Sequence, residues 1–172
     1  MSLDIAIFDK NKHERQGFDC GEPALNRYLL EQASQDIQNN YVRLIVGTKQ
    51  GSNKIVGYYT LSNAGVRLED ILEQLRKKLP RYPSVPAILL GRLAIDKARQ
   101  GQGLGSELMA DAIFRSLSNF SAWAIMVVQA KDDTACAFYK KFQFLPLMDD
   151  PHHLYVRKVD LEHFVTQWLL SK

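Results

Sequence analysis

The chain has 172 residues, of which 46% are hydrophobic and 24% are charged, and it contains only 10 glycines and 6 prolines. This composition excludes a disordered, collagenous or repeat-array protein, and the length favours a single domain over residues 1–172. A domain of this size buries roughly 70% of the surface of its unfolded chain, so folding requires no disulfide or metal. The net charge of +3, from 22 Lys and Arg against 19 Asp and Glu, is by itself too small to indicate nucleic-acid binding.

The apolar segments and the cysteines indicate the cellular compartment. Apolar runs such as residues 87–90 are far shorter than the roughly 20 residues of a bilayer-spanning helix, and the N-terminus resembles no export signal. We therefore expect a cytoplasmic protein without a membrane partner, in which Cys20 and Cys136 are reduced thiols. The four histidines follow no metal-ligand spacing, so we expect them at the surface and expect no metal site.

Hydrophobic periodicity predicts six strands and five helices that alternate along the chain. The expected strands lie at 3–8, 42–48, 55–64, 87–95, 123–130 and 154–159, and the expected helices lie near 25–39, 68–79, 104–113, 132–142 and 161–169. In the third helix, Leu104, Leu108 and Ala112 are expected to face inward, with Met109 and Ile113 beside them. The order indicates an α+β or α/β fold with a mixed sheet between helices.

A glycine-rich turn joins the apolar strand at 87–95 to the third helix. Three glycines within five residues indicate positive φ angles or a close approach of the backbone to a ligand. Free N–H groups at the start of the following helix suit a phosphate. A Rossmann loop requires glycine where Ser106 stands, and a P-loop requires Gly-Lys followed by Ser or Thr, so neither motif is present. The remaining pattern is [Q/R]-x-x-G-x-[G/A], filled by Gln100, Gly103 and Gly105.

This pattern resembles the pyrophosphate-binding loop of the GNAT superfamily of N-acetyltransferases. A later helix in that superfamily follows AxxxYxxxGF, and this chain has Ala135, Tyr139 and Phe144 at matching positions. Further segments are similar to the GNAT toxins of bacterial toxin-antitoxin pairs, and together they extend the resemblance from Phe18 to Val156. These segments are Phe18-x-Cys20-Gly21, Leu25-Asn26-x-Tyr28-Leu29, Gly57 to Ser62, Leu79 to Pro83 and Leu90 to Ala94.

The resemblance implies a GNAT-like fold, with a mixed, mostly antiparallel central sheet flanked by helices and splayed between the fourth and fifth strands. It implies transfer of acetyl from acetyl-CoA to the α-amino group of aminoacyl-tRNA, which blocks translation. The amine attacks directly, so neither cysteine acts as a nucleophile. The residues implied to bind acetyl-CoA are Leu93, Ala94, Ile95, Gln100, Gly101, Gln102, Gly103, Leu104, Gly105 and Ser106.

Tyr139 is the expected general acid for the departing coenzyme A thiolate. With a thiol pKa of about 8.5 and a tyrosine pKa of about 10, proton transfer from tyrosine to the thiolate is unfavourable by only about 2 kcal/mol. No histidine or carboxylate stands out as a general base. A lysine amine is only about 0.04% neutral at pH 7, whereas an α-amine is about 14% neutral, so the missing base favours an α-amine acceptor.

Basic residues provide candidate contacts to tRNA. Arg76, Lys77, Lys78 and Arg81 cluster without an intervening acid and are expected at the phosphate backbone, with Arg92 and Lys140 nearer the terminal adenosine. The toxin resemblance also implies a small DNA-binding antitoxin as partner and a homodimer.

Two positions depart from the family pattern, and two other functions stay open. Gln143 stands where the superfamily has glycine, and Gln129 stands where an acidic residue is expected at the end of the fifth strand. The acceptor is alternatively a small amine, a peptide or a protein N-terminus. The other alternative is a non-catalytic module that binds acyl-CoA and regulates a partner.

Overall fold

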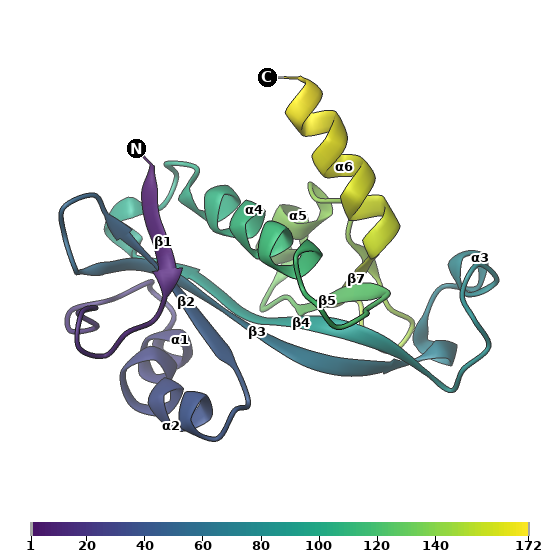
Figure 1. The fold of residues 1–172 in the computed structure, drawn as a ribbon, viewed down its shortest axis with the longest axis horizontal. Coiled ribbons are helices and arrows are strands. Elements are labelled where there is room, and N and C mark those ends of the chain that lie inside the picture. Colours follow the sequence, from purple (N-terminus) through teal and green to yellow (C-terminus); the bar gives the residue numbers. More distant parts are fainter. Residues whose placement is uncertain (1, 172) are drawn as a thin grey trace. The chain divides into compact units, whose positions relative to one another are not determined.

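The computed structural model describes residues 2–171, which separate into two compact units. Unit 1 contains residues 2–62 and 90–115, and unit 2 contains residues 63–89 and 116–171. The single domain expected from the length stays a prediction. The strand order is β1-β2-β3-β4-β5-β7-β6, with β4 and β5 parallel in an otherwise mostly antiparallel sheet (Figure 1). The expected mixed sheet is therefore confirmed, and the splay between its fourth and fifth strands stays a prediction.

All six predicted strands form, and one more is added. The strands are β1 (Leu3–Ile7), β2 (Arg43–Lys49), β3 (Ile55–Arg67), β4 (Ser84–Ile95), β5 (Ile125–Gln129), β6 (Leu145–Pro146) and β7 (His153–Arg157). The α-helices are α1 (Pro23–Arg27), α2 (Ala33–Gln38), α3 (Glu73–Arg76), α4 (Leu104–Leu117), α5 (Asp133–Lys140) and α6 (Lys158–Leu170). β6 is not predicted from the sequence, because two residues are too few to produce a periodic pattern.

In unit 1, α1 and α2 cover one face of the β1–β3 strands, and α4 covers the other face (Figure 1). The five residues predicted to face inward from α4 are at most 1% exposed, which confirms that prediction. Close packing of strand against helix depends on Gly57. A β-carbon there would lie 2.6 Å from Ile95, 2.9 Å from Leu108 and 3.1 Å from the carbonyl oxygen of Ala94. Only glycine fits this position.

A π-helical turn at Tyr28–Gln32 joins α1 to α2, so the single helix expected here is continuous but not uniform. The N–H of Ala33 donates to the carbonyl of Tyr28, five residues earlier. Apolar residues that recur every four positions shift gradually around an α-helix, which has 3.6 residues per turn. The π-helical turn contains more residues per turn and so brings them back to the buried face. Leu29 and Ala33 are consequently both fully buried.

The helix predicted over 68–79 is wrong for most of its length. The segment forms a 3-10 turn at Leu68–Asp70, becomes extended at Ile71 and Leu72, and is α-helical only at Glu73–Arg76. The carbonyl of Asp70 accepts a hydrogen bond from the N–H of Met148 at 2.8 Å, a partner far outside this segment. Ile71 is 1% exposed within the apolar core of unit 2. Tertiary contacts therefore outweigh the helical pattern.

His13 corrects the expectation that all histidines lie at the surface, because it is only 7% exposed. Its Nδ1 accepts a hydrogen bond from the N–H of Asp9 at 2.9 Å, and its ring stacks on Phe8. Within residues 2–171 no helix has the length and hydropathy required to cross a bilayer. In the same range, no group of three or more His, Cys, Asp or Glu side chains is arranged to hold a metal ion.

Replacing Gln143 by glycine is expected to stabilise the protein. Gln143 has a φ of 73°, so this position keeps the left-handed backbone that glycine adopts at no cost. Relief of about 1–2 kcal/mol of strain exceeds the roughly 0.5–1 kcal/mol entropic cost of glycine. Thermal unfolding should show a Tm about 2–4 °C higher, for a net gain near 1 kcal/mol. A Tm lowered by the substitution would show that the glutamine side chain stabilises this turn.

Candidate functional site

The glycine-rich turn of unit 1 has the backbone of an anion-binding loop. Gly101 and Gly103 have φ angles of 76° and 79°, in the left-handed region. A β-carbon at either position would meet no atom within 4 Å, so glycine is required by the backbone angle and not by crowding. Left-handed residues that alternate with other conformations turn successive N–H groups toward one side and form an anion-binding concavity.

The N–H groups of this turn are free to donate hydrogen bonds to a ligand. Within residues 2–171, the backbone N–H groups of Gly101 to Ser106 donate no hydrogen bond. The next N–H group, of Glu107, donates to the carbonyl of Gly103 at 3.1 Å and starts the regular pattern of α4. Free donors at the positive end of a 14-residue helix match the requirements of a diphosphate.

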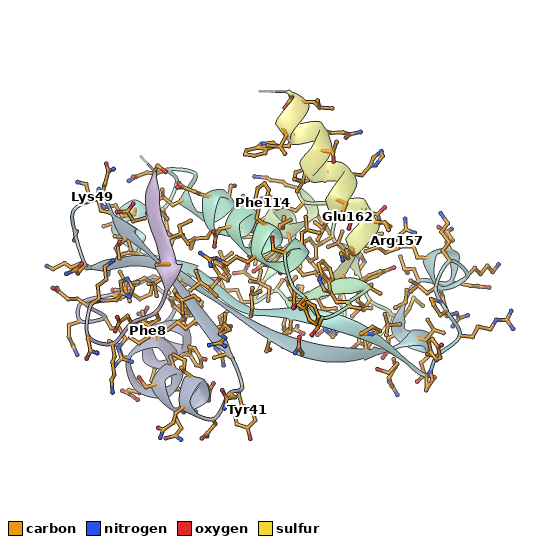
Figure 2. All side chains as sticks on the ribbon, viewed as in Figure 1. Phe8, Tyr41, Lys49, Phe114, Arg157 and Glu162 are labelled. Atoms are coloured by element: carbon orange, nitrogen blue, oxygen red, sulfur yellow. The ribbon has the colours of Figure 1, made fainter. Side chains whose placement is uncertain are left out.

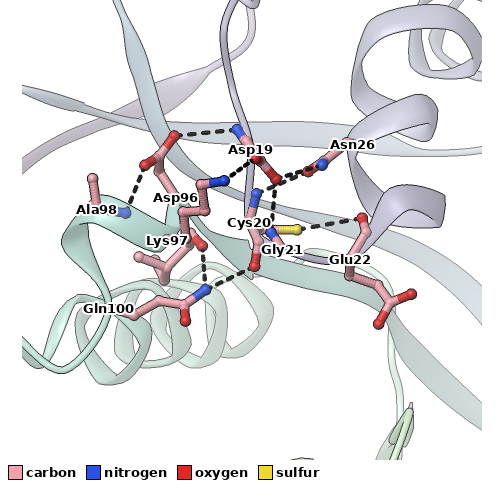
Figure 3. Close-up of polar contacts among 10 residues, drawn as sticks. Asp19, Cys20, Gly21, Glu22, Asn26, Asp96, Lys97, Ala98 and Gln100 are labelled. Carbon is pink, nitrogen blue, oxygen red and sulfur yellow. Dashed lines mark hydrogen bonds and ion pairs between the residues drawn. The ribbon is translucent and has the colours of Figure 1, made fainter.

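Gln100 holds the turn in place through its side-chain amide. Its Nε2 donates to the carbonyl oxygens of Cys20 and Ile95, both at 2.9 Å (Figure 3). This amide therefore links the end of β4 to the segment before α1. Gln100 is among the residues predicted to bind acetyl-CoA, and in the structure its side chain supports the loop.

An ion pair between Asp19 and Lys97 fixes the same two segments (Figure 3). Lys97 Nζ lies 2.6 Å from Asp19 Oδ2, and the Lys97 N–H donates to the Asp19 carbonyl at 2.8 Å. Hydrogen bonds from Lys97, Gly21 and Asn26 lower the pKa of the Asp19 carboxyl to about 2. Their stabilising effect is present above the ordinary carboxyl pKa and is lost as the pH falls through about 2. The linkage is therefore intact at neutral pH.

The end of β4 leads directly into this turn. Ala94 and Ile95 are 5% and 8% exposed, and Leu93 is partly buried. The N–H of Asp96 donates to the carbonyl of Val56 at 2.8 Å, which anchors the end of β4 to β3. The three strand residues predicted to contact the donor and the glycine-rich turn thus belong to one unit.

Tyr139, the predicted general acid, lies on α5 in unit 2. The residue is 7% exposed, and its ring contacts Phe138 edge-on at 5.2 Å and Phe144 at 5.7 Å between centroids. Among residues 2–171 its hydroxyl makes no hydrogen bond, so no protein group competes for its proton. Burial raises the pKa of Tyr139. The shift widens the gap between the pKa of Tyr139 and that of the coenzyme A thiol. Desolvation of the thiolate partly offsets this gap, because it raises the thiol pKa as well.

The predicted tRNA-binding residues divide between the two units. Arg92 is in unit 1, and its guanidinium lies 3.5 Å from the centroid of the Tyr28 ring beside a pocket of about 310 Å³. The remaining residues, Arg76, Lys77, Lys78, Arg81 and Lys140, are in unit 2. Lys140 is exposed in the last turn of α5. Lys77 forms an exposed pair with Glu73 at 3.7 Å, which contributes little stability.

A comparison with known protein families gives one match over most of the chain. The model described as "Acetyltransferase (GNAT) family" matches residues 10–144. The chain belongs to the GNAT acetyltransferase family. The glycine-rich turn and β4 of this GNAT acetyltransferase lie within the matched range, and so does Tyr139.

Individual relatives are similar to this GNAT acetyltransferase over nearly its whole length. A tRNA-acetylating toxin of Mycobacterium tuberculosis (strain ATCC 25618 / H37Rv) is 37% identical over 139 residues, covering 80% of this chain and 81% of that protein. The toxin AtaT complexed with acetyl-methionyl-tRNAfMet has a TM-score of 0.85 at 31% identity, covering 95% and 99% of the two chains. An AtaT mutant bound to acetyl-CoA and the C-terminus of the antitoxin AtaR has a TM-score of 0.78 at 29% identity, covering 96% and 99%.

The two departures from the GNAT pattern have local explanations in this acetyltransferase. Gln143 has a φ of 73°, in the left-handed region that glycine favours, at the position where the GNAT pattern has glycine. Gln129 Nε2 donates to Asp150 Oδ2 at 3.2 Å, so an acidic group is nearby although it comes from another segment. Cys136 is buried, and burial raises its thiol pKa, which disfavours the nucleophilic thiolate.

The residues that support the glycine-rich turn were not predicted from the sequence. The N–H of Asp19 donates to Asp96, 77 residues away in the chain, and the side-chain amide of Asn26 donates to Asp19 from seven residues away. Asp19 lies inside the toxin-like segment Phe18-x-Cys20-Gly21, and Asn26 belongs to the toxin-like segment Leu25-Asn26-x-Tyr28-Leu29, but neither was given a role from the sequence. Hydrogen bonds over such separations leave no periodic trace in a single sequence.

Proposed function

We propose that this GNAT acetyltransferase transfers acetyl from acetyl-CoA to the α-amino group of the amino acid on charged tRNA and thereby blocks translation as a toxin. The observation that carries the proposal is its 37% identity, over 80% of the chain, with a tRNA-acetylating toxin. The likeness to AtaT in complex with an acetylated aminoacyl-tRNA supports the same acceptor.

The donor is held by the backbone of unit 1. The free N–H groups of Gly101 to Ser106 bind the diphosphate, and Gln100 keeps the turn in its binding conformation. Backbone groups of Leu93, Ala94 and Ile95 pair with the amides of the donor's flexible arm. An N–H near Leu93 polarises the thioester carbonyl, as donors of an oxyanion hole do. The free N–H groups fit a diphosphate without any metal ligand.

Tyr139 supplies the proton that the departing thiolate takes up. The acceptor amine forms the new C–N bond as the C–S bond breaks, and the hydroxyl proton of Tyr139 passes to sulfur. The proton that the amine loses passes through water to the Tyr139 phenolate, so the phenol is restored for the next turnover. Because burial raises the pKa of Tyr139, the phenol remains protonated throughout the neutral range and is ready to donate.

The pH dependence of the reaction reports on the acceptor amine. An α-amine with a pKa of about 7.8 gives initial rates that rise about tenfold per pH unit below that value and then level off. The raised pKa of Tyr139 predicts no alkaline decline up to about pH 10. Initial rates of acetyl transfer to freshly charged tRNA, measured from pH 6 to 10, test this profile. A descending limb centred near pH 8 or 9 contradicts the assignment of a buried, protonated tyrosine as the acid.

The nucleic acid and protein partners follow from the same proposal. Arg92 and Lys140 contact the terminal adenosine, and Arg76, Lys77, Lys78 and Arg81 contact phosphates. A small DNA-binding antitoxin neutralises the toxin, as supported by the complex of AtaT with the C-terminus of AtaR. The active form is a homodimer, and its site of action is the cytoplasm, where charged tRNA is found.

One experiment tests the proposed function against its alternatives. Labelled acetyl-CoA is offered together with charged tRNA, uncharged tRNA, a polyamine and a peptide with a free N-terminus. Label on the aminoacyl group of charged tRNA alone is the expected result. Label confined to the polyamine or the peptide contradicts the tRNA acceptor. Binding of acetyl-CoA without release of free thiol in any mixture identifies a non-catalytic module.

A further inference from the structure

The strongest unassigned feature is a groove of about 890 Å³ in unit 2, between the end of β3 and the start of β4. It is built by a segment that is apolar on one side and basic on the other. Leu75 and Leu79 pack against the core of unit 2, and the Leu68 N–H donates to the Pro83 carbonyl at 3.3 Å. This anchoring leaves the cationic side chains on the outside.

The charge of the groove is positive after internal pairing is counted. Arg67 is paired with two carboxylates, Glu69 at 2.9 Å and Asp70 at 3.0 Å, and contributes no free positive charge. Among residues 2–171, the side chains of Arg76 and Arg81 form no ion pair and no hydrogen bond, and both residues line the groove. Two uncompensated guanidinium groups beside one cavity favour a ligand that carries several negative charges, such as a nucleic-acid backbone.

An exposed aromatic side chain shares this groove with the two arginines. Tyr82 lines the groove and is 68% exposed. An aromatic face beside cations is the combination that binds single-stranded nucleic acid, with bases stacking on the ring and phosphates contacting the cations. A duplex keeps its bases stacked inside and offers no base to such a ring.

We infer that this groove binds an unpaired nucleotide of an RNA, with its base stacked on Tyr82 and its flanking phosphates on Arg76 and Arg81. The inference rests on the proposed function, since charged tRNA is the RNA that this enzyme meets as substrate. It extends that function by assigning Tyr82 to the RNA and by giving the basic cluster a preference for unpaired nucleotides.

The test uses a 12-nucleotide single-stranded RNA and a blunt duplex of the same sequence, titrated at several salt concentrations. Tyr82→Ala is expected to weaken binding of the single strand by roughly 5- to 150-fold, the effect of losing one stacked base. The slope of log affinity against log salt should not change, because no charge is removed. Tyr82→Phe should bind like the wild type, since the aromatic face is retained.

Tyr41→Ala is the matched control, because Tyr41 is 69% exposed and lies in unit 1 (Figure 2). It should leave both affinities unchanged. The double variant Arg76→Gln with Arg81→Gln should reduce the salt slope for the single strand by about 1.4, or 0.7 per phosphate contact. If Tyr82→Ala weakens the affinity for the single strand and for the duplex by the same factor, the inference is overturned. The inference is also overturned if poly-glutamate displaces RNA equally well from the wild type and from Tyr82→Ala, a result that indicates an acidic-peptide site.

Failure of this inference is distinguishable from failure of the proposed function. If the wild type acetylates charged tRNA and Tyr82→Ala has the same KM for it, only the assignment of Tyr82 is wrong. If the wild type transfers no acetyl to charged tRNA, the proposed function is wrong, whatever the groove binds. In the expected case Tyr82→Ala raises the KM for charged tRNA and leaves the KM for acetyl-CoA unchanged.

Discussion

Tyr139→Phe is expected to lower kcat for acetyl transfer by about 100-fold or more, because a general acid contributes roughly 10²- to 10⁴-fold. The KM for acetyl-CoA should not change, since the donor is bound by the backbone of unit 1. Phenylalanine preserves the ring contacts with Phe138 and Phe144, and the lost hydroxyl makes no hydrogen bond among residues 2–171. Steady-state kinetics with charged tRNA and thermal unfolding of the same preparation measure both effects.

A matched variant separates catalysis from general damage to the core. Tyr155→Phe removes the hydroxyl of another buried tyrosine in the same unit, on β7. This variant should keep kcat within about twofold of the wild type. Undiminished transfer by Tyr139→Phe, or equal losses in the two variants, would remove Tyr139 as the proton donor.

Gly103→Ala is expected to weaken acetyl-CoA binding by at least about tenfold. Alanine at a φ of 79° costs about 1–2 kcal/mol, so the turn moves toward negative φ and its N–H groups no longer converge. A tenfold loss corresponds to about 1.4 kcal/mol of binding free energy. Isothermal titration with coenzyme A measures the affinity, and kcat at saturating acetyl-CoA should stay near the wild-type value.

Gly51 provides the control for backbone strain. It has a φ of 75° in the turn between β2 and β3, and a β-carbon there also meets no atom within 4 Å. Gly51→Ala should therefore lose about as much stability as Gly103→Ala but bind coenzyme A with unchanged affinity. If both variants bind coenzyme A like the wild type, the turn is not the diphosphate site.

The same turn shows how a short sequence motif depends on the rest of the fold. Its glycines set the φ angles, but its position is fixed by Gln100 and by the pair of Asp19 with Lys97. These contacts bring residues before α1 against the end of β4 and leave the N–H groups free. The motif supplies the donors, and distant residues hold them in a fixed arrangement.

The amino-acid sequence by itself determined six of the strands, four of the five predicted helices, the inward face of α4 and the glycine-rich turn before it. Each of these depends on residues close together in the chain, through alternation, helical spacing or the backbone freedom of glycine. Only the tertiary structure decided that residues 68–79 do not form one helix. There the bond from Met148 to Asp70 and the burial of Ile71 replace local hydrogen bonds. The support from Asp19 and the groove beside Tyr82 also arise from contacts between distant segments, which a local pattern does not record.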